Sequence, residues 1–264
     1  MINLPTSTTT TRKLRNLTSV LGFGYNSHQN DHRVVKISFS RRRKSGNNEN
    51  RPLVEVYSVL DRIWRTIPVN FLVDNSINWI FSSHCFVNGV IHWLTWEKGI
   101  NSSIGERILS FDVVEETFQI IKFPEAIIFK KRSAETLGIF EYKSKLSVSH
   151  CEYYPSGLLR FGICKIWVKE EESWSMILSV KVGALIPTGP VEYLGRNRNL
   201  FGFARRSDDK MLLLCDTRTN TFSEFGHRQH KSTKFAAFTE SLVLLEQNTD
   251  VCMDDALERH EHST

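Results

Sequence analysis

The chain has 264 residues, of which 41% are hydrophobic and 24% are charged, with a formal net charge of +5. Its basic residues are spread along the chain apart from Arg41, Arg42, Arg43 and Lys44, so composition does not indicate a dedicated nucleic-acid-binding protein. No stretch approaches the ~20 apolar residues that span a bilayer, and the first residues lack the apolar core of a secretory signal. We therefore expect a soluble, cytoplasmic and/or nuclear protein with no membrane or nucleic-acid partner.

The cysteine pattern favours a reducing compartment. Cys85, Cys151, Cys164, Cys215 and Cys252 make an odd number, and no C-x-x-C spacing occurs. Cys164 and Cys215 border or occupy apolar strands and are expected to be small core residues.

Strand and turn signals follow one another along the chain. Residues 1–20 indicate a loop or a partial blade edge, and 22–39 predict two strands around a polar turn at Asn26 to Asp31. Two further hairpins are predicted with turns at Asn88-Gly89 and near Lys143-Ser144. A last hairpin is expected in 234–247, and 248–264 is expected to be a polar, disordered tail.

One pattern recurs four times: an apolar strand ends at an anchor, a polar turn follows, and an aromatic residue stands seven positions after the anchor. The anchor pairs are Tyr57/Trp64, Phe111/Phe118, Trp167/Trp174 and Cys215/Phe222. Successive first anchors lie 54, 56 and 48 residues apart, a spacing typical of propeller blades. We predict an all-β, kelch-like β-propeller with at least four blade units, incomplete at its N-terminus. The anchors, Trp64 and Trp174 among them, are predicted to be structural and to pack between blades.

The predicted loops 40–52, 96–107, 150–163 and 205–210 join equivalent strands, so they should emerge on one face of the propeller. This face would carry the candidate partner-binding residues, because Trp, Tyr and Arg dominate binding hot spots. The candidates are Arg41, Arg42, Arg43, Trp96, Tyr153 and Tyr154.

The ordered series of segments 22–37, 54–67, 86–96, 108–124 and 166–180 resembles the plant F-box-associated interaction domain over roughly residues 20–245. In that family, the domain follows an F-box that docks a Skp-type adaptor of a cullin ubiquitin ligase. The resemblance implies that the domain recruits a target protein for ubiquitination. Residues 1–20 are too short for an F-box, so adaptor and cullin binding are expected only if an F-box is supplied upstream. Residues 21–247 would form the associated domain.

Catalytic motifs are missing from the sequence: it contains no phosphate-binding G-x-x-x-x-G-K, no H-E-x-x-H and no G-x-S-x-G. Cys85 and His92 have opposite parity across a turn and are expected to point to opposite faces, which argues against a metal site. We expect a non-catalytic binding module without a cofactor. The alternatives are a propeller enzyme, which needs convergent carboxylates or metal ligands, and a glycan- or RNA-binding propeller, which needs an aromatic-lined patch.

Overall fold

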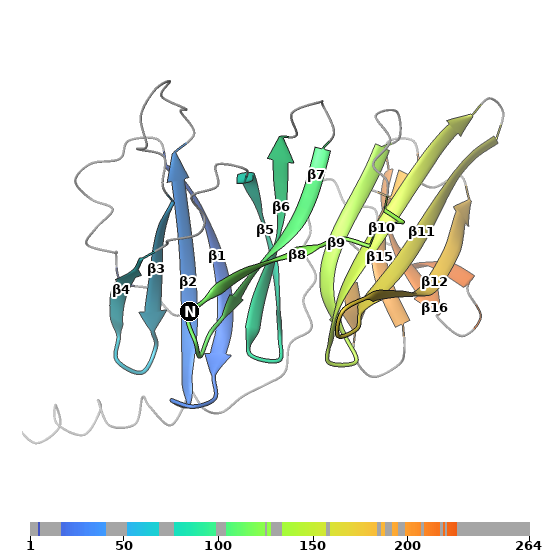
Figure 1. Cartoon of the computed structure of the whole chain (residues 1–264). Coiled ribbons are helices and arrows are strands. Elements are labelled where there is room, and N and C mark those ends of the chain that lie inside the picture. The colour runs from blue at the N-terminus through green and yellow to red at the C-terminus, as the bar shows by residue number, and fades with distance from the viewer. Residues whose placement is uncertain are drawn as a thin grey trace, which may run out of the picture. The chain divides into compact units, whose positions relative to one another are not determined.

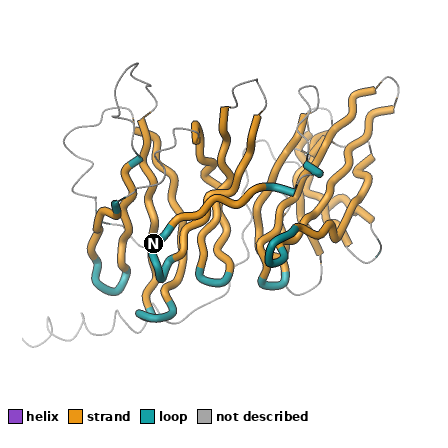
Figure 2. The backbone as a smooth tube through the Cα atoms, in the orientation of Figure 1, coloured by secondary structure: helices purple, strands orange, loops and turns teal. Residues whose placement is uncertain are grey.

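The computed structural model describes residues 5, 17–40, 52–68, 77–98, 104–124, 126–127, 134–156, 159–183, 186–187, 192–194, 199–206, 209–216, 219 and 221–225. The chain divides into two compact units, Met1–Thr233 and Lys234–Thr264, and every described residue lies in the first. The described residues form strands and turns and contain no helix that could cross a membrane (Figure 2).

The strands form antiparallel sheets that follow one another along the chain (Figure 1). The first sheet contains β1 (Leu17–Asn26), β2 (Asp31–Ser40), β3 (Leu53–Ser58) and β4 (Ile63–Ile67) in this order. The second contains β5 (Ile77–Val87), β6 (Val90–Lys98), β7 (Ile104–Asp112) and β8 (Phe118–Lys122). The third contains β9 (Ala134–Tyr142), β10 (Lys145–Ser156), β11 (Leu159–Lys169) and β12 (Trp174–Gly183). The fourth contains β13 (Ile186–Pro187), β14 (Glu192–Leu194), β15 (Asn199–Arg206), β16 (Asp209–Asp216) and β17 (Thr221–Phe225).

Each copy of the sequence repeat forms the last two strands of one sheet. Tyr57 pairs with Trp64, Phe111 with Phe118, and Cys215 with Phe222, directly across the two strands. The ring centroids of Tyr57 and Trp64 lie 5.1 Å apart and those of Phe111 and Phe118 lie 4.7 Å apart. The expected all-β architecture of repeated units is therefore confirmed, and it is consistent with a propeller-like domain.

The third repeat departs from this pairing. Trp167 pairs with Met176, two residues beyond Trp174, and Trp174 pairs with Lys169. The reason is that the turn at 170–173 begins three residues after the first anchor, whereas the turn of the first repeat begins two residues after Tyr57. A register shift between Ile166 and Trp167 adds a β-bulge to the hairpin. Trp174 still packs against the core between the second and third sheets and donates from Nε1 to the carbonyl of Lys122 at 3.0 Å.

Successive sheets pack face to face around their first strands. β1 contacts β5, β5 contacts β9, and β9 contacts β14. The core between the first two sheets buries Val35, Ile37, Trp93, Leu109 and Phe111 among others. A second core between the next two sheets includes Leu94, Ile108, Ile139 and Val148. Apolar residues on both faces of the middle strands thus bind each sheet to its neighbours.

Three of the predicted loops are shorter than expected. β6 extends to Lys98, β10 extends to Ser156, and β15 extends to Arg206. Trp96, Tyr153 and Tyr154 therefore lie in strands, and their prediction as loop residues is wrong. Aromatic residues favour extended, paired backbone, which explains the longer strands. The loop 41–51 with its arginines lies outside the described residues.

Candidate protein-interaction surface

The turns at one end of the sheets share a common design. The β1–β2 and β3–β4 turns have four residues each, and in the β7–β8 turn the Asp112 N–H donates to the Thr117 carbonyl at 2.9 Å and encloses the four residues 113–116. The last of the four residues adopts a positive φ in each case: 52° at Asn30, 58° at Arg62 and 55° at Glu116. The side chain before each turn accepts backbone N–H groups of that turn. Asn26 Oδ1 accepts from His28 and Gln29, Ser58 Oγ from Asp61, and Asp112 Oδ1 from Val114 and Glu115. These side chains hold the turns in one conformation.

Hydrogen bonds link the turns of one sheet to those of the next, and the β5–β6 and β9–β10 turns take part as well. Asn26 Nδ2 donates to the Val113 carbonyl at 3.3 Å, and Asn88 Nδ2 donates to the Ser144 carbonyl at 2.8 Å. Arg65 of β4 forms a two-pronged ion pair with Glu116 of the second sheet. We call this side of the first three sheets the hairpin end. The second strands of these sheets, β2, β6 and β10, all begin at the hairpin end. Their C-terminal ends therefore lie together on the opposite side.

A buried carboxylate joins two turns within the hairpin end. Asp31 accepts from Leu60 N at 2.8 Å and from Ser58 Oγ at 2.6 Å, and pairs with Arg33 Nε at 3.0 Å. Because a buried charge is costly unless it is paired and hydrogen-bonded, these contacts specify one arrangement of the two turns. The hairpin end is therefore a rigid support.

Two glycines of β1 bring the first sheet close to the second. A Cβ at Gly22 would lie 2.2 Å from Trp93 Cζ2, and one at Gly24 would lie 2.8 Å from Val113 Cγ2. Because side chains alternate along a strand, Leu21 and Phe23 point to the other face, where they are exposed. The backbone N–H of Phe23 is bonded to His84 Nε2 at 3.2 Å.

The predicted partner-binding residues that the structure describes lie near the ends of the second strands of two sheets. Trp96 lies near the end of β6, where it pairs with Trp79 and Glu106 in register. Tyr153 and Tyr154 lie near the end of β10, opposite Gly162 and Phe161. Arg41 to Arg43 follow β2 outside the described residues. The connections after β2, β6, β10 and β15 join the second and third positions of each sheet, as the sequence predicted.

Sequence reasoning missed several exposed apolar side chains. Leu60 and Ile63 lie on the β3–β4 hairpin, and Met176 and Ile177 lie on β12. The run Met176-Ile177-Leu178 contained a signal, because three successive apolar residues break the alternation of a half-buried strand. The bulge explains how two neighbouring residues of this run both reach the surface.

The prediction that Cys85 and His92 point to opposite faces of the sheet is wrong. The two residues are direct cross-strand partners around a two-residue turn, so they share one face. His92 Nδ1 lies 2.8 Å from Ser110 Oγ, and burial lowers the pKa of its imidazole to about 4. Burial, with Glu141 nearby, raises the pKa of the Cys85 thiol. Both groups are held neutral at pH 7. A nucleophilic cysteine–histidine pair instead needs a charged thiolate and imidazolium, so the environment of Cys85 and His92 does not favour this chemistry.

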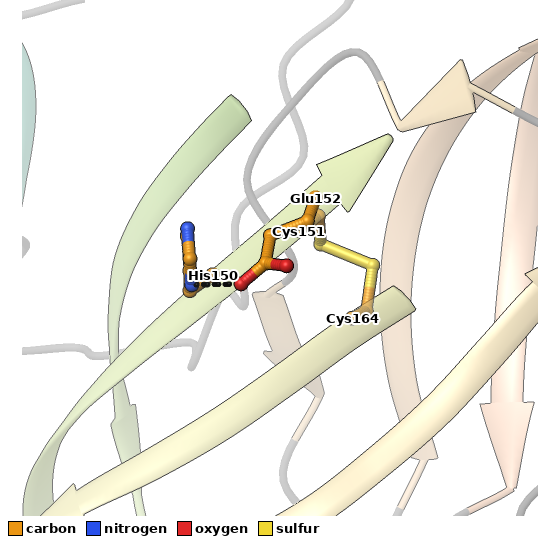
Figure 3. Close-up of a disulfide and its surroundings, with 4 residues drawn as sticks. All are labelled: His150, Cys151, Glu152 and Cys164. Carbon is orange, nitrogen blue, oxygen red and sulfur yellow. Dashed lines mark ion pairs between the residues drawn. A yellow bond between two sulfur atoms is a disulfide. The ribbon is translucent and has the colours of Figure 1, made fainter. Parts of the chain in front are cut away.

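A disulfide joins Cys151 to Cys164, so the expectation of unlinked cysteines is wrong for this pair. The two residues face each other across β10 and β11 and are buried, and Figure 3 shows the bond with its neighbours. Glu152, the next residue, pairs with Lys165 at 3.2 Å and lies 3.5 Å from His150 Nδ1. Among the residues that the structure describes, no group of three or more His, Cys, Asp or Glu side chains could hold a metal ion.

The fold and its surfaces define a repeat-built, propeller-like β domain. The chain matches the family described as the F-box associated beta propeller domain over residues 5–247, and it belongs to this family. No curated protein matches the chain. A similar solved structure is Zg3597, a family 117 glycoside hydrolase produced by the marine bacterium Zobellia galactanivorans. It shares 8% sequence identity with a TM-score of 0.41 over 80% of this chain and 70% of that chain, a likeness too low to bear on function.

Proposed function

We propose that this chain is a non-catalytic, kelch-like target-binding module of an F-box-type substrate receptor. In this role it binds a protein that a cullin ubiquitin ligase then ubiquitinates. The observation that carries the proposal is the family match over residues 5–247, since an F-box-associated domain acts in the context of an F-box protein. A Skp-type adaptor and cullin join only through an F-box upstream of the domain.

The arrangement of the sheets favours target binding at the side opposite the hairpin end. The hairpin end is occupied by its own hydrogen bonds between turns. On the opposite side, Trp96, Tyr153 and Tyr154 stand near the strand ends of neighbouring sheets. Connections that vary in length around a rigid scaffold are common positions for binding residues. These three aromatics and Arg41 to Arg43 are the proposed contact residues.

Affinity purification tests the proposed role directly. The chain would be expressed alone and as a fusion with an F-box upstream, and proteins that copurify with each would be identified by mass spectrometry. We expect a common target protein with both forms, and adaptor and cullin with the fusion alone. A fusion that recovers adaptor and cullin but never a target would refute target binding by this domain.

Substitution of the proposed contacts tests the location of the surface. Trp96→Ala or the double variant Tyr153→Ala/Tyr154→Ala should weaken target binding by at least about 2 kcal/mol if the residues are hot spots. Leu60→Ala on the hairpin end is the control, because Leu60 is an exposed apolar residue outside the proposed surface. Loss of binding with Leu60→Ala and full binding with the aromatic variants would place the target at the hairpin end.

The proposed ligase role requires a cytoplasmic and/or nuclear location. A fluorescent fusion of the chain should therefore appear in these compartments. Exclusive accumulation in the secretory pathway would contradict the proposal.

A further inference from the structure

The outer strand of the third sheet differs from the other outer strands in length. β12 has ten residues, whereas β4, β8 and β17 have five each. It is the end strand of its sheet and pairs only with β11 in the described structure. An end strand carries backbone N–H and C=O groups directed away from its sheet, and a long one offers a template for an added strand.

The side chains of β12 are not those of a protected edge. Met176 is 50% exposed and Ile177 is 43% exposed, with exposed Ser175, Ser179 and Lys181 around them. We call these five residues the rim strip. The bulge at Met176 and Ile177 brings two adjacent apolar side chains to the surface instead of one. Outer strands usually limit such exposure with charges, prolines or shortness, and this strip has a charge only at Lys181.

Neighbouring strands leave the rim strip uncovered. Trp174 closes the start of β12 against the second sheet through its bond to the Lys122 carbonyl, and β8 ends at Lys122. Leu178 and Val180, which follow the bulge, are buried. The apolar residues that remain outside are therefore available to a partner.

Charges at the two ends of β12 favour an added strand with complementary charges at its own ends. Exposed Glu171 and Glu172 stand in the turn before β12, and exposed Lys181 stands near its end. A strand added antiparallel would place its N-terminal part beside Lys181 and its C-terminal part beside the two glutamates. Electrostatic complementarity then favours an acidic residue early in the added strand and a basic residue late in it.

The rim strip also leads toward the proposed target-binding side. Gly183, the last residue of β12, pairs with Gly162, which pairs on its other side with Tyr153. The N-terminal part of a segment bound antiparallel to β12 would therefore lie near the end of β10, which carries the proposed contact residues Tyr153 and Tyr154.

We propose that β12 binds an extended segment of the target protein as an additional strand of the third sheet. The segment has about ten residues, at ~3.3 Å per residue along the strand. It carries an acidic residue, then apolar residues opposite Met176 and Ile177, then a basic residue. Main-chain hydrogen bonds supply affinity in this mode, and the alternate side chains supply specificity. This inference rests on the proposed target-binding function and names the kind of target segment.

Selection from a display library of unstructured peptides of about this length, using the full chain as bait, tests the proposal. We expect enriched peptides with the acidic–apolar–basic order. Their affinity should fall at least about tenfold with Ile177→Lys, because a charge is then placed on the docking edge. Ile63→Lys is the matched control, since Ile63 is 62% exposed on outer strand β4. It should leave affinity unchanged.

Further measurements keep the test decisive. Hydrogen exchange should show peptide-dependent protection of β12 amides, and Lys181→Glu should prefer a peptide whose acidic residue is changed to lysine. If Ile177→Lys lowers the melting temperature, Lys181→Glu takes its place as the test variant. Failure to enrich any peptide, or equal loss with Ile63→Lys, overturns the proposal. So does concentration-dependent dimerisation that Ile177→Lys abolishes, since the strip would then bind a second copy of the chain.

The outcome separates this inference from the proposed function. A copurified target that binds Ile177→Lys as well as the unaltered chain would refute the docking site and leave target binding standing. Peptides that bind β12 while no target protein copurifies would instead refute the proposed receptor role alone.

Discussion

The indole Nε1 of Trp93 donates a hydrogen bond to the carbonyl oxygen of Leu21 at 3.1 Å, which joins β6 of the second sheet to β1 of the first. The same indole lies over Gly22, where a Cβ would approach Cζ2 to 2.2 Å. The Trp93 side chain therefore has two roles. It fills the core, and its N–H binds a backbone carbonyl of β1 on the side of the strand that faces away from β2. Such contacts, with the bond from Phe23 to His84, limit pairing of the β1 edge with another chain.

Gly22→Ala should destabilise the domain. The added methyl group has no space beside the fully buried Trp93, and overpacking of this kind typically costs about 1–3 kcal/mol. Chemical denaturation would measure the change. Phe23→Ala, on the exposed face of the same strand, should have a smaller effect, and equal losses for the two variants would contradict the close packing at Gly22.

Trp93→Ala should cost more stability than replacement of either repeat-anchor tryptophan. Trp93 is fully buried, and removal of such a side chain typically costs about 3–5 kcal/mol. Trp64 and Trp174 are only half-buried, so their replacement removes less apolar area from the core. Denaturation midpoints of the three alanine variants would give the order. A larger loss for Trp64→Ala would show that the repeat anchors dominate the core.

Acid should weaken the fold through His92. Burial lowers its pKa from 6.5 to about 4, so between these values the unfolded chain binds a proton that the folded chain does not. Stability attributable to this group is complete above pH 6.5, falls as the pH drops below it, and stops falling below about pH 4. The total loss is about 3 kcal/mol, at 1.36 kcal/mol per pH unit.

His92→Gln provides the comparison, since its amide can still bond to Ser110. The difference in unfolding free energy between the variant and the unaltered chain should change between pH 7 and pH 4. A constant difference over this range would show that the imidazole is not buried in a neutral form.

The Cys151–Cys164 disulfide should add to stability. The two residues are 13 positions apart, and in the chain-entropy model a loop of similar size contributes about 3 kcal/mol. Alkylation of denatured, unreduced protein should modify Cys85, which is free, and spare Cys151 and Cys164. The double variant Cys151→Ser/Cys164→Ser should then unfold at lower denaturant. Complete alkylation of Cys151 without reductant would show that the bond does not form.

The same experiment on protein taken directly from cells bears on the proposed location. Disulfides are rare in the cytosol, but the burial of both cysteines hinders attack by a thiolate. We expect the bond to survive mild reductant in the folded protein and to break on denaturation. Rapid reduction of the folded protein would instead indicate that β10 and β11 open readily.

Local chemistry in the sequence determined which segments become hairpins. Asn88-Gly89 and Lys143-Ser144 both adopt the positive φ of tight hairpin turns, and Ser58 and Asp112 hold longer turns with their own side chains. These effects depend on residues only a few positions apart, so the repeat could be predicted from the sequence. The family resemblance, now shown over residues 5–247, rested on the same ordered hairpins.

The surfaces were decided by contacts between distant segments. Trp96, Tyr153 and Tyr154 lie in paired strands instead of the predicted loops, because β6 and β10 continue to pair with their neighbours. The cross-strand register places Cys85 beside His92. The exposure of Met176 and Ile177 depends on a bulge and on where β8 ends in the neighbouring sheet. Alternation within a strand specifies which residues share a face. Only the packing of one sheet on the next decides which of those faces is buried and which is left for a partner.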